Sequence, residues 1–153
     1  MPKKTSPDPA GIPINHGILP DLIGYQLRLA QIRVFRDFMD ATAAHDISPG
    51  LLGVLLLIEA NPGLKQSELA AAVHLDRSTM VGVIDRLERR GWVERRAARA
   101  DRRAYQVLLT QAGGAQMREF RQLLAQHEQR IIAGLSPAEI DTLHRLLPRI
   151  SAG

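Results

Sequence analysis

The sequence predicts a mainly α-helical fold that carries one small β-wing. Apolar residues recur at helical spacing over most of the chain, whereas only two short runs are β-prone. Within residues 64–110, a short helix, a tight turn and a longer helix precede these two runs, which flank an arginine-rich loop. This order is typical of a winged helix-turn-helix. We therefore expect a winged helix-turn-helix at 46–110, flanked by helical dimerisation regions at 16–45 and 111–153.

The N-terminal part of the chain is expected to hold an arm and a long helix. Residues 1–15 contain four prolines and no helical pattern, which predicts a flexible arm. The first long helix is expected at 19–44. Pro20 falls in its first turn, where proline is tolerated. Apart from one charged stripe, its circumference is largely apolar. This apolar surface is wider than packing against a single neighbour requires. The stripe, which we expect to be solvated, consists of Arg33, Arg36, Asp37 and Asp40.

Arg28 interrupts the apolar side of this first helix. A guanidinium buried there needs a partner, because an unpaired buried charge is strongly unfavourable. One interpretation is a structural ion pair with Asp21, one heptad earlier, or with an acid of a second subunit. The other is that Arg28, with Tyr25 and Ile32 beside it, binds the carboxylate or phosphate of a small effector.

The central helices form the expected helix-turn-helix. Ser48 caps a helix whose apolar run at 51–58 is expected in the core. A short helix at 66–73 is followed by a turn, and Asp76 caps the longer helix, which continues to Arg90. That helix divides into an inward apolar face and an outward polar face, as recognition helices do. The inward residues are Met80, Val83, Ile84 and Leu87, and the outward residues are Arg77, Thr79, Gly82, Arg86, Arg89 and Arg90.

The wing is expected beyond Gly91, which ends the recognition helix. Two β-prone runs, 92–96 and 105–109, surround a basic loop at 97–103. From residue 86 to residue 103 there are eight arginines against three acids, a local charge of +5 in a chain whose net charge is +4. The positive field is therefore concentrated here, which favours double-stranded DNA as the partner.

Two helices are expected to follow the wing. Thr110 caps a long helix at 111–134. His127 falls on the apolar stripe of that helix, where we expect a core or interface histidine rather than a ligand. Ser136 and Glu139 form a capping box that starts the last helix.

A second subunit is expected to cover the remaining apolar surface. The terminal helices carry more apolar surface than one chain of 153 residues can bury alone. We therefore predict a two-fold homodimer built from residues 16–40 and 115–150. Its two recognition helices would enter successive major grooves, about 34 to 36 Å apart, and an effector that favours another spacing would lower the affinity for DNA.

Several motifs in residues 20–150 resemble the MarR (multiple antibiotic resistance regulator) family of bacterial transcription factors. The resemblance implies an obligate homodimer that reads a pseudo-palindromic operator, acts as a repressor and reaches the flanking minor grooves with its wings. The run at 23–28 is similar to a branch that responds to aromatic acids or their CoA thioesters, which implies a small anionic effector. The motifs are Leu69-Ala70, Asp76-Arg77-Ser78-Thr79, Asp85-Arg86-Leu87-Glu88, Arg90-Gly91-Trp92-Val93-Glu94-Arg95, Asp101-Arg102-Arg103 and Leu109-Thr110.

The chain departs from the family pattern at three places. Lys65 stands where a Thr N-cap is usual, so the start of the short helix is less well capped. His74 occupies a turn position that is often Gly, and we interpret it as a turn residue because His tolerates positive φ. Val81-Gly82 replaces Thr-Arg on the outward face, which removes a bidentate contact to guanine.

These patterns predict how the DNA contacts are divided. Base reading is expected from Ser78, Thr79 and Arg86, together with groove shape. Arg99 at the wing tip is expected in the minor groove, whereas Asp101 orients a neighbouring arginine. The full predicted DNA-binding set is Arg77, Ser78, Thr79, Gly82, Arg86, Arg95, Arg96, Arg99, Asp101, Arg102 and Arg103, and the predicted effector-binding set is Tyr25, Arg28 and Ile32.

Composition argues against other classes of protein. The absence of cysteine excludes disulfides and thiol-based sites. We expect no cofactor, no metal and no catalytic role, because no nucleophile–base pair, phosphate loop or spaced histidine pair occurs. The chain has no apolar leader or spanning run, so we expect a cytoplasmic protein without a membrane partner. The alternatives are a non-specific architectural DNA-binding protein, a winged-helix protein-interaction module and a metal sensor assembled across an interface.

Overall fold

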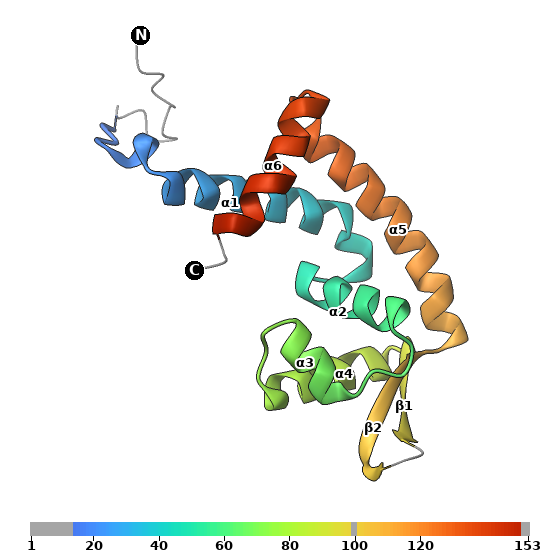
Figure 1. Ribbon diagram of the computed structural model, residues 1–153. Helices are drawn as coiled ribbons and strands as arrows, with labels where there is room; N and C mark the ends of the chain where they lie inside the picture. Colours follow the sequence, from blue (N-terminus) through green and yellow to red (C-terminus); the bar gives the residue numbers. More distant parts are fainter. Residues whose placement is uncertain (1–13, 99–100, 151–153) are drawn as a thin grey trace. The chain divides into compact units, whose positions relative to one another are not determined.

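The computed structural model describes residues 14–98 and 101–150, except for the side chains of residues 98 and 101–104. Helices dominate this part of the chain, and its two strands pair as one antiparallel ribbon (Figure 1). The predicted class, mainly α with a small β-wing, is confirmed. In chain order the elements are η1 (Leu19–Asp21), α1 (Ile23–Ala41), η2 (Ala43–His45), α2 (Pro49–Ala60), α3 (Gln66–Ala72), α4 (Arg77–Arg89), β1 (Val93–Ala98), β2 (Asp101–Leu109), α5 (Gln111–Ile132) and α6 (Pro137–Ile150).

The chain forms two compact units, and the division falls inside α1, between Arg36 and Asp37. The first unit therefore contains η1 and most of α1, and the second contains every later element. The predicted assignment of residues 16–45 and 111–153 to dimerisation stays a prediction.

The first helix is shorter than predicted, because both of its ends are interrupted. Leu22 has an extended backbone (ψ 123°), and the Gln26 side chain, rather than a helical N–H, donates to the Pro20 carbonyl at 2.7 Å. At the other end, the Thr42 hydroxyl hydrogen-bonds the Phe38 carbonyl at 2.9 Å and the Ile47 carbonyl at 3.2 Å. A side chain that binds the backbone in this way competes with the helix. The prediction of one helix over 19–44 is therefore wrong at its boundaries.

The core of the second unit lies among α2, α3, α4, the ribbon and α5. Five residues of the predicted apolar run of α2 are buried and the other three are half-buried, and the inward face of α4 is completely inaccessible at Met80, Ile84 and Leu87. Both predictions are confirmed. The largest fully buried side chains are Phe120, Ile47, Leu55, Ile58, Leu69, Met80, Ile84, Leu87, Met117, Val54, Val93 and Val107.

The turns around the recognition helix follow the sequence. His74 has φ 54°, which confirms its interpretation as a turn residue at positive φ. Gly91 has φ 70° directly after the C-cap residue Arg90, so it ends α4 as expected. Lys65 makes no side-chain cap, and the start of α3 depends on Glu68, whose carboxylate accepts from the Lys65 N–H at 2.7 Å.

The ribbon is longer than predicted. Strands β1 and β2 pair in regular register from Val93 opposite Leu109 to Ala97 opposite Tyr105. A register shift then brings Ala98 opposite Asp101. The predicted loop at 97–103 is therefore wrong in extent, because pairing continues beyond Ala97 on β1 and before Tyr105 on β2.

One polar cluster joins the end of α1 to α5. His127 is only 3% exposed, and its Nδ1 lies 2.6 Å from Asp37, which confirms a core histidine. Arg130 donates to both oxygens of Asp37 from 2.9 Å. These hydrogen bonds, first from Arg130 and then from His127, lower the pKa of Asp37 to about 2. The expectation that Asp37 belongs to a merely solvated stripe is therefore wrong.

Gly113 lies where α5 closely approaches the backbone just before β1. A Cβ atom at this position in α5 would lie 1.9 Å from the backbone oxygen of Trp92, which also accepts from the Thr110 N–H at 3.0 Å. A backbone oxygen cannot rotate away as a flexible side chain can. Only glycine therefore allows α5 to start so close to the ribbon.

We predict that Gly113→Ala lowers the free energy of unfolding by about 1–3 kcal/mol, the usual effect of overpacking a filled site. Gly114→Ala is the matched control, because a Cβ there meets nothing within 4 Å. It should leave stability unchanged or raise it by up to about 1 kcal/mol through helix propensity. Urea unfolding of both variants measures the difference. Equal shifts for the two would contradict the predicted clash.

Candidate nucleic-acid interface

The N-terminus of the recognition helix α4 is fixed by Asp76. Its carboxylate accepts from the Thr79 backbone N–H at 2.8 Å, from the Ser78 hydroxyl at 2.5 Å and from the Thr79 hydroxyl at 2.6 Å. These hydrogen bonds, led by that from Ser78, hold the pKa of Asp76 well below its usual range. Both hydroxyl hydrogens are thus committed within the chain. Towards an outside partner, Ser78 and Thr79 present lone pairs, which suit the amino groups of adenine or cytosine.

The outward face of α4 lies opposite its buried residues. Ser78, Gly82, Asp85 and Arg89 are all exposed there, and a Cβ at Gly82 would meet nothing within 4 Å. Asp85 was not among the predicted site residues. Helical spacing alone places Asp85 on the outward face. This acid was missed from the sequence because only the arginines and hydroxyl residues of the helix were weighed.

Arg95 lies between the ribbon and the recognition helix. Its guanidinium forms ion pairs with Asp85 and Glu88 of α4 and donates to Gln66 of α3 at 3.2 Å. The side chain is only 18% exposed. In the structure Arg95 links the ribbon to α4, and its predicted contact with DNA stays a prediction. Arg96 next to it is 66% exposed and pairs with Glu94.

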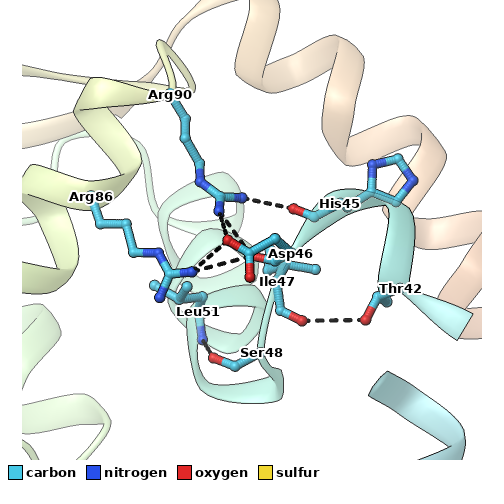
Figure 2. Close-up of polar contacts among 8 residues, drawn as sticks. All are labelled: Thr42, His45, Asp46, Ile47, Ser48, Leu51, Arg86 and Arg90. Carbon is cyan, nitrogen blue, oxygen red and sulfur yellow. Dashed lines mark hydrogen bonds and ion pairs between the residues drawn. The ribbon is translucent and has the colours of Figure 1, made fainter. Parts of the chain in front are cut away.

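Arg86 and Arg90 converge on Asp46, in the loop before α2 (Figure 2). Arg90 donates to the His45 carbonyl at 2.8 Å and to the Asp46 carbonyl at 2.9 Å, and its guanidinium carbon lies 4.9 Å from the centroid of the Trp92 ring. Both arginines were predicted to face outward. The structure turns both towards this loop, because Asp46 supplies a carboxylate and the end of η2 supplies unpaired carbonyls.

The remaining predicted contacts divide by position. Arg77 is exposed at the start of α4. Arg99 at the wing tip lies outside the described residues, and the backbones of Asp101, Arg102 and Arg103 belong to β2 while their side chains lie outside the described part.

A groove runs beside α4 on the side of α2. Its volume is about 570 Å³. Glycines at three lining positions, Gly50, Gly53 and Gly82, keep it open, and a Cβ on either of the last two would meet nothing within 4 Å. Apart from Arg86, its lining side chains are apolar or hydroxyl-bearing. The groove carries no carboxylate, so an anionic group can enter it without repulsion from its walls.

The predicted effector residues lie on α1 in the first unit. Tyr25, Arg28 and Ile32 have the i, i+3, i+7 spacing of one helix face, with Tyr25 half-buried and the other two exposed. No ion pair links Arg28 to Asp21 in the described chain. The extended backbone at Leu22 removes the helical spacing on which that pairing depended. A partner acid on a second subunit stays a prediction.

The described residues contain no group of three or more His, Asp or Glu side chains arranged to hold a metal ion. Among them, no helix is both long and apolar enough to cross a membrane.

A capped recognition helix with an exposed outward face, tied to an arginine-bearing ribbon, defines a winged-helix DNA-binding regulator. Residues 47–105 match the model of the MarR family. A protein of Thauera aromatica assigned as a transcriptional regulatory protein for the hcr operon is 39% identical over 136 residues, which are 88% of this chain and 82% of that protein. The chain therefore belongs to the MarR family, as its motifs predicted.

Solved structures agree with this assignment. The transcriptional repressor CouR bound to a 23-mer DNA duplex matches with a TM-score of 0.86 and 37% identity, over 90% of this chain and 98% of CouR. CouR bound to p-coumaroyl-CoA matches with a TM-score of 0.82 and 34% identity, over 91% of this chain and 98% of CouR. Both forms of that repressor thus share the fold described here.

Proposed function

We propose that this protein is a homodimeric repressor that binds a pseudo-palindromic operator and is released by a small organic anion, such as an aromatic acid or its CoA thioester. One observation carries the proposal most directly. The outward face of α4 is exposed, is fixed in orientation by a cap and ion pairs, and lies beside a basic ribbon in a member of a family of DNA-binding regulators.

The DNA contacts follow from the two faces of this lobe. Ser78 and Thr79 can accept hydrogen bonds from base amino groups, whereas Gly82 allows the helix backbone to approach the groove floor closely. The wing arginines, Arg102 and Arg103 among them, supply salt-dependent affinity for phosphates. The lobe thereby separates base reading on α4 from phosphate binding on the wing.

A second subunit is proposed because apolar side chains on both terminal regions are exposed. The first unit exposes Phe35 at 50% and Ile23 at 67%, and α6 buries none of its residues. Surfaces of this kind normally mark an interface. The exposed set includes Ile18, Leu19, Leu22, Ile23, Ile32, Val34, Phe35, Met39, Leu143, Leu146, Leu147 and Ile150.

An anionic effector is proposed on the Tyr25, Arg28 and Ile32 face of α1. An arginine and a tyrosine beside an aliphatic side chain offer a charge for a carboxylate or phosphate and apolar area for an aromatic ring. CouR, which shares this fold, binds p-coumaroyl-CoA. An effector lowers operator affinity only through stronger binding to a dimer with another spacing of its recognition helices.

The division of DNA contacts predicts opposite signatures for two variants. Arg103→Ala should weaken binding to all duplexes by a similar factor and reduce the salt slope of log K by about 1, because a phosphate contact is lost. Thr79→Ala should weaken binding mainly to the operator, by about 1–3 kcal/mol if a base contact is lost. Fluorescence anisotropy with an operator and a scrambled duplex measures both. If each variant lost the same factor on both duplexes, the division would be wrong.

The effector site predicts a ligand-dependent gain in stability. Aromatic acids and their CoA thioesters should include at least one compound that raises the Tm of the wild type and leaves the Tm of Arg28→Ala unchanged. Arg33→Ala, in the charged stripe of the same helix, is the matched control and should respond like the wild type. A thermal-shift screen gives the answer. An equal response of wild type and Arg28→Ala to every active compound would remove Arg28 from the site.

A further inference from the structure

We infer that Asp46 is a positioning residue for DNA binding, whose carboxylate holds Arg86 so that a free N–H group of the guanidinium meets a backbone phosphate. The inference rests on the proposed DNA-binding function and deepens it. It assigns Arg86 to the phosphate backbone, in place of the base contact expected from the sequence, and gives a function to a loop residue outside the helix-turn-helix.

The geometry leaves the Nε and Nη1 donors of Arg86 available. Only its Nη2 atom is engaged, at 2.9 Å from the Asp46 carboxylate and 3.3 Å from the Asp46 carbonyl. The Nη1 and Nε atoms have no partner within the described chain, and the side chain is 43% exposed. The Nε and Nη1 N–H groups point in different directions, so each remains as a separate charged donor that can bind one phosphate oxygen.

The loop that carries Asp46 is held by contacts on both sides of this residue. Asp46 itself has φ 46°, a left-handed conformation, and its carbonyl is held by Arg90. Arg90 in turn contacts the Trp92 ring and the His45 carbonyl. The next residue, Ile47, is only 1% exposed and anchors the loop in the core. The Asp46 backbone is therefore held in place, and its carboxylate can orient the Arg86 guanidinium (Figure 2).

The surroundings of Arg86 favour a phosphate over a base. Arg86 lies seven residues, about two helical turns, beyond Thr79 on the same side of α4. Recognition helices contact base edges mainly with their N-terminal residues, so Arg86 lies further from the base-reading end of the helix. On the Arg86 flank lies the glycine-lined groove, whose lining residues include no acid that would repel a phosphate.

The opposite role for Asp46 is a restraint that keeps Arg86 away from DNA. The two roles differ in the sign of one measurable coupling. A positioning carboxylate increases the contribution of Arg86 to DNA affinity, whereas a competing carboxylate decreases it.

A double-mutant cycle of Asp46→Asn and Arg86→Gln separates these roles. Asn is a close match in shape and tolerates the left-handed conformation of residue 46. The change in net charge and the loss of the Arg90 contact occur in both backgrounds, so they cancel in the cycle. Affinity is measured by fluorescence anisotropy on a duplex of about 30 base pairs of arbitrary sequence, over a range of salt concentrations.

We expect Asp46→Asn to be less favourable for DNA affinity in the wild-type background than in the Arg86→Gln background, by about threefold or more. Arg86→Gln alone should reduce the salt slope by about one. Asp40→Asn is the matched control, since Asp40 is an exposed acid and its removal should show no coupling to Arg86.

Two results would overturn the inference. Equal factors in both backgrounds would leave Asp46 with a structural role only, and a coupling of the opposite sign would make it a restraint. Failure of the wild type to bind any duplex would instead refute the proposed function itself, so the two failures are distinguishable.

Discussion

Met80, Ile84 and Leu87 are completely inaccessible to solvent, and their packing fixes the rotation of α4 about its own axis. A helix held in this way has only one set of residues that can face outward. Ser78, Gly82, Asp85 and Arg89 occupy that face because they lie opposite the buried stripe. Losing the stripe would free the helix to rotate, and no arrangement of polar residues on its surface would then define a reading face.

Polar contacts complete the immobilisation of α4. Asp76 caps its start, Arg95 ties its acids to the ribbon, and Arg90 ties its end to the loop before α2. Exposed ion pairs add little to stability singly, but here they lie around one rigid helix and set its direction. Arg90 and Arg95 both form ion pairs within the chain, which a count of arginines in the sequence does not reveal.

Much of the fold could be predicted because its signals are local. The caps at Ser48, Asp76, Thr110 and Ser136, and the turn at His74, are specified by residues within a few positions of one another. The buried face of α4 follows from spacing alone.

The long-range polar contacts could not be predicted in the same way. Asp46 meets Arg86 and Arg90 across 40 and 44 positions, and Asp37 meets His127 across 90. Helical periodicity carries no information about such distant pairs, so the sequence predicted that Arg86 and Arg90 face solvent. The effector site is hard to predict for another reason. An exposed helix face such as that of Arg28 becomes a pocket only when other surfaces cover it.

Sequence-specific recognition by the α4 face is the central claim, and the ratio of two affinities tests it most directly. The protein would first select its preferred duplex from a random library, and its affinity for that duplex and for a scrambled version would then be measured at the same salt concentration. A regulator of this kind should prefer the selected duplex by about 10³-fold or more, with two half-sites about one helical turn apart. Equal affinities would contradict the claim and identify a non-specific architectural DNA-binding protein.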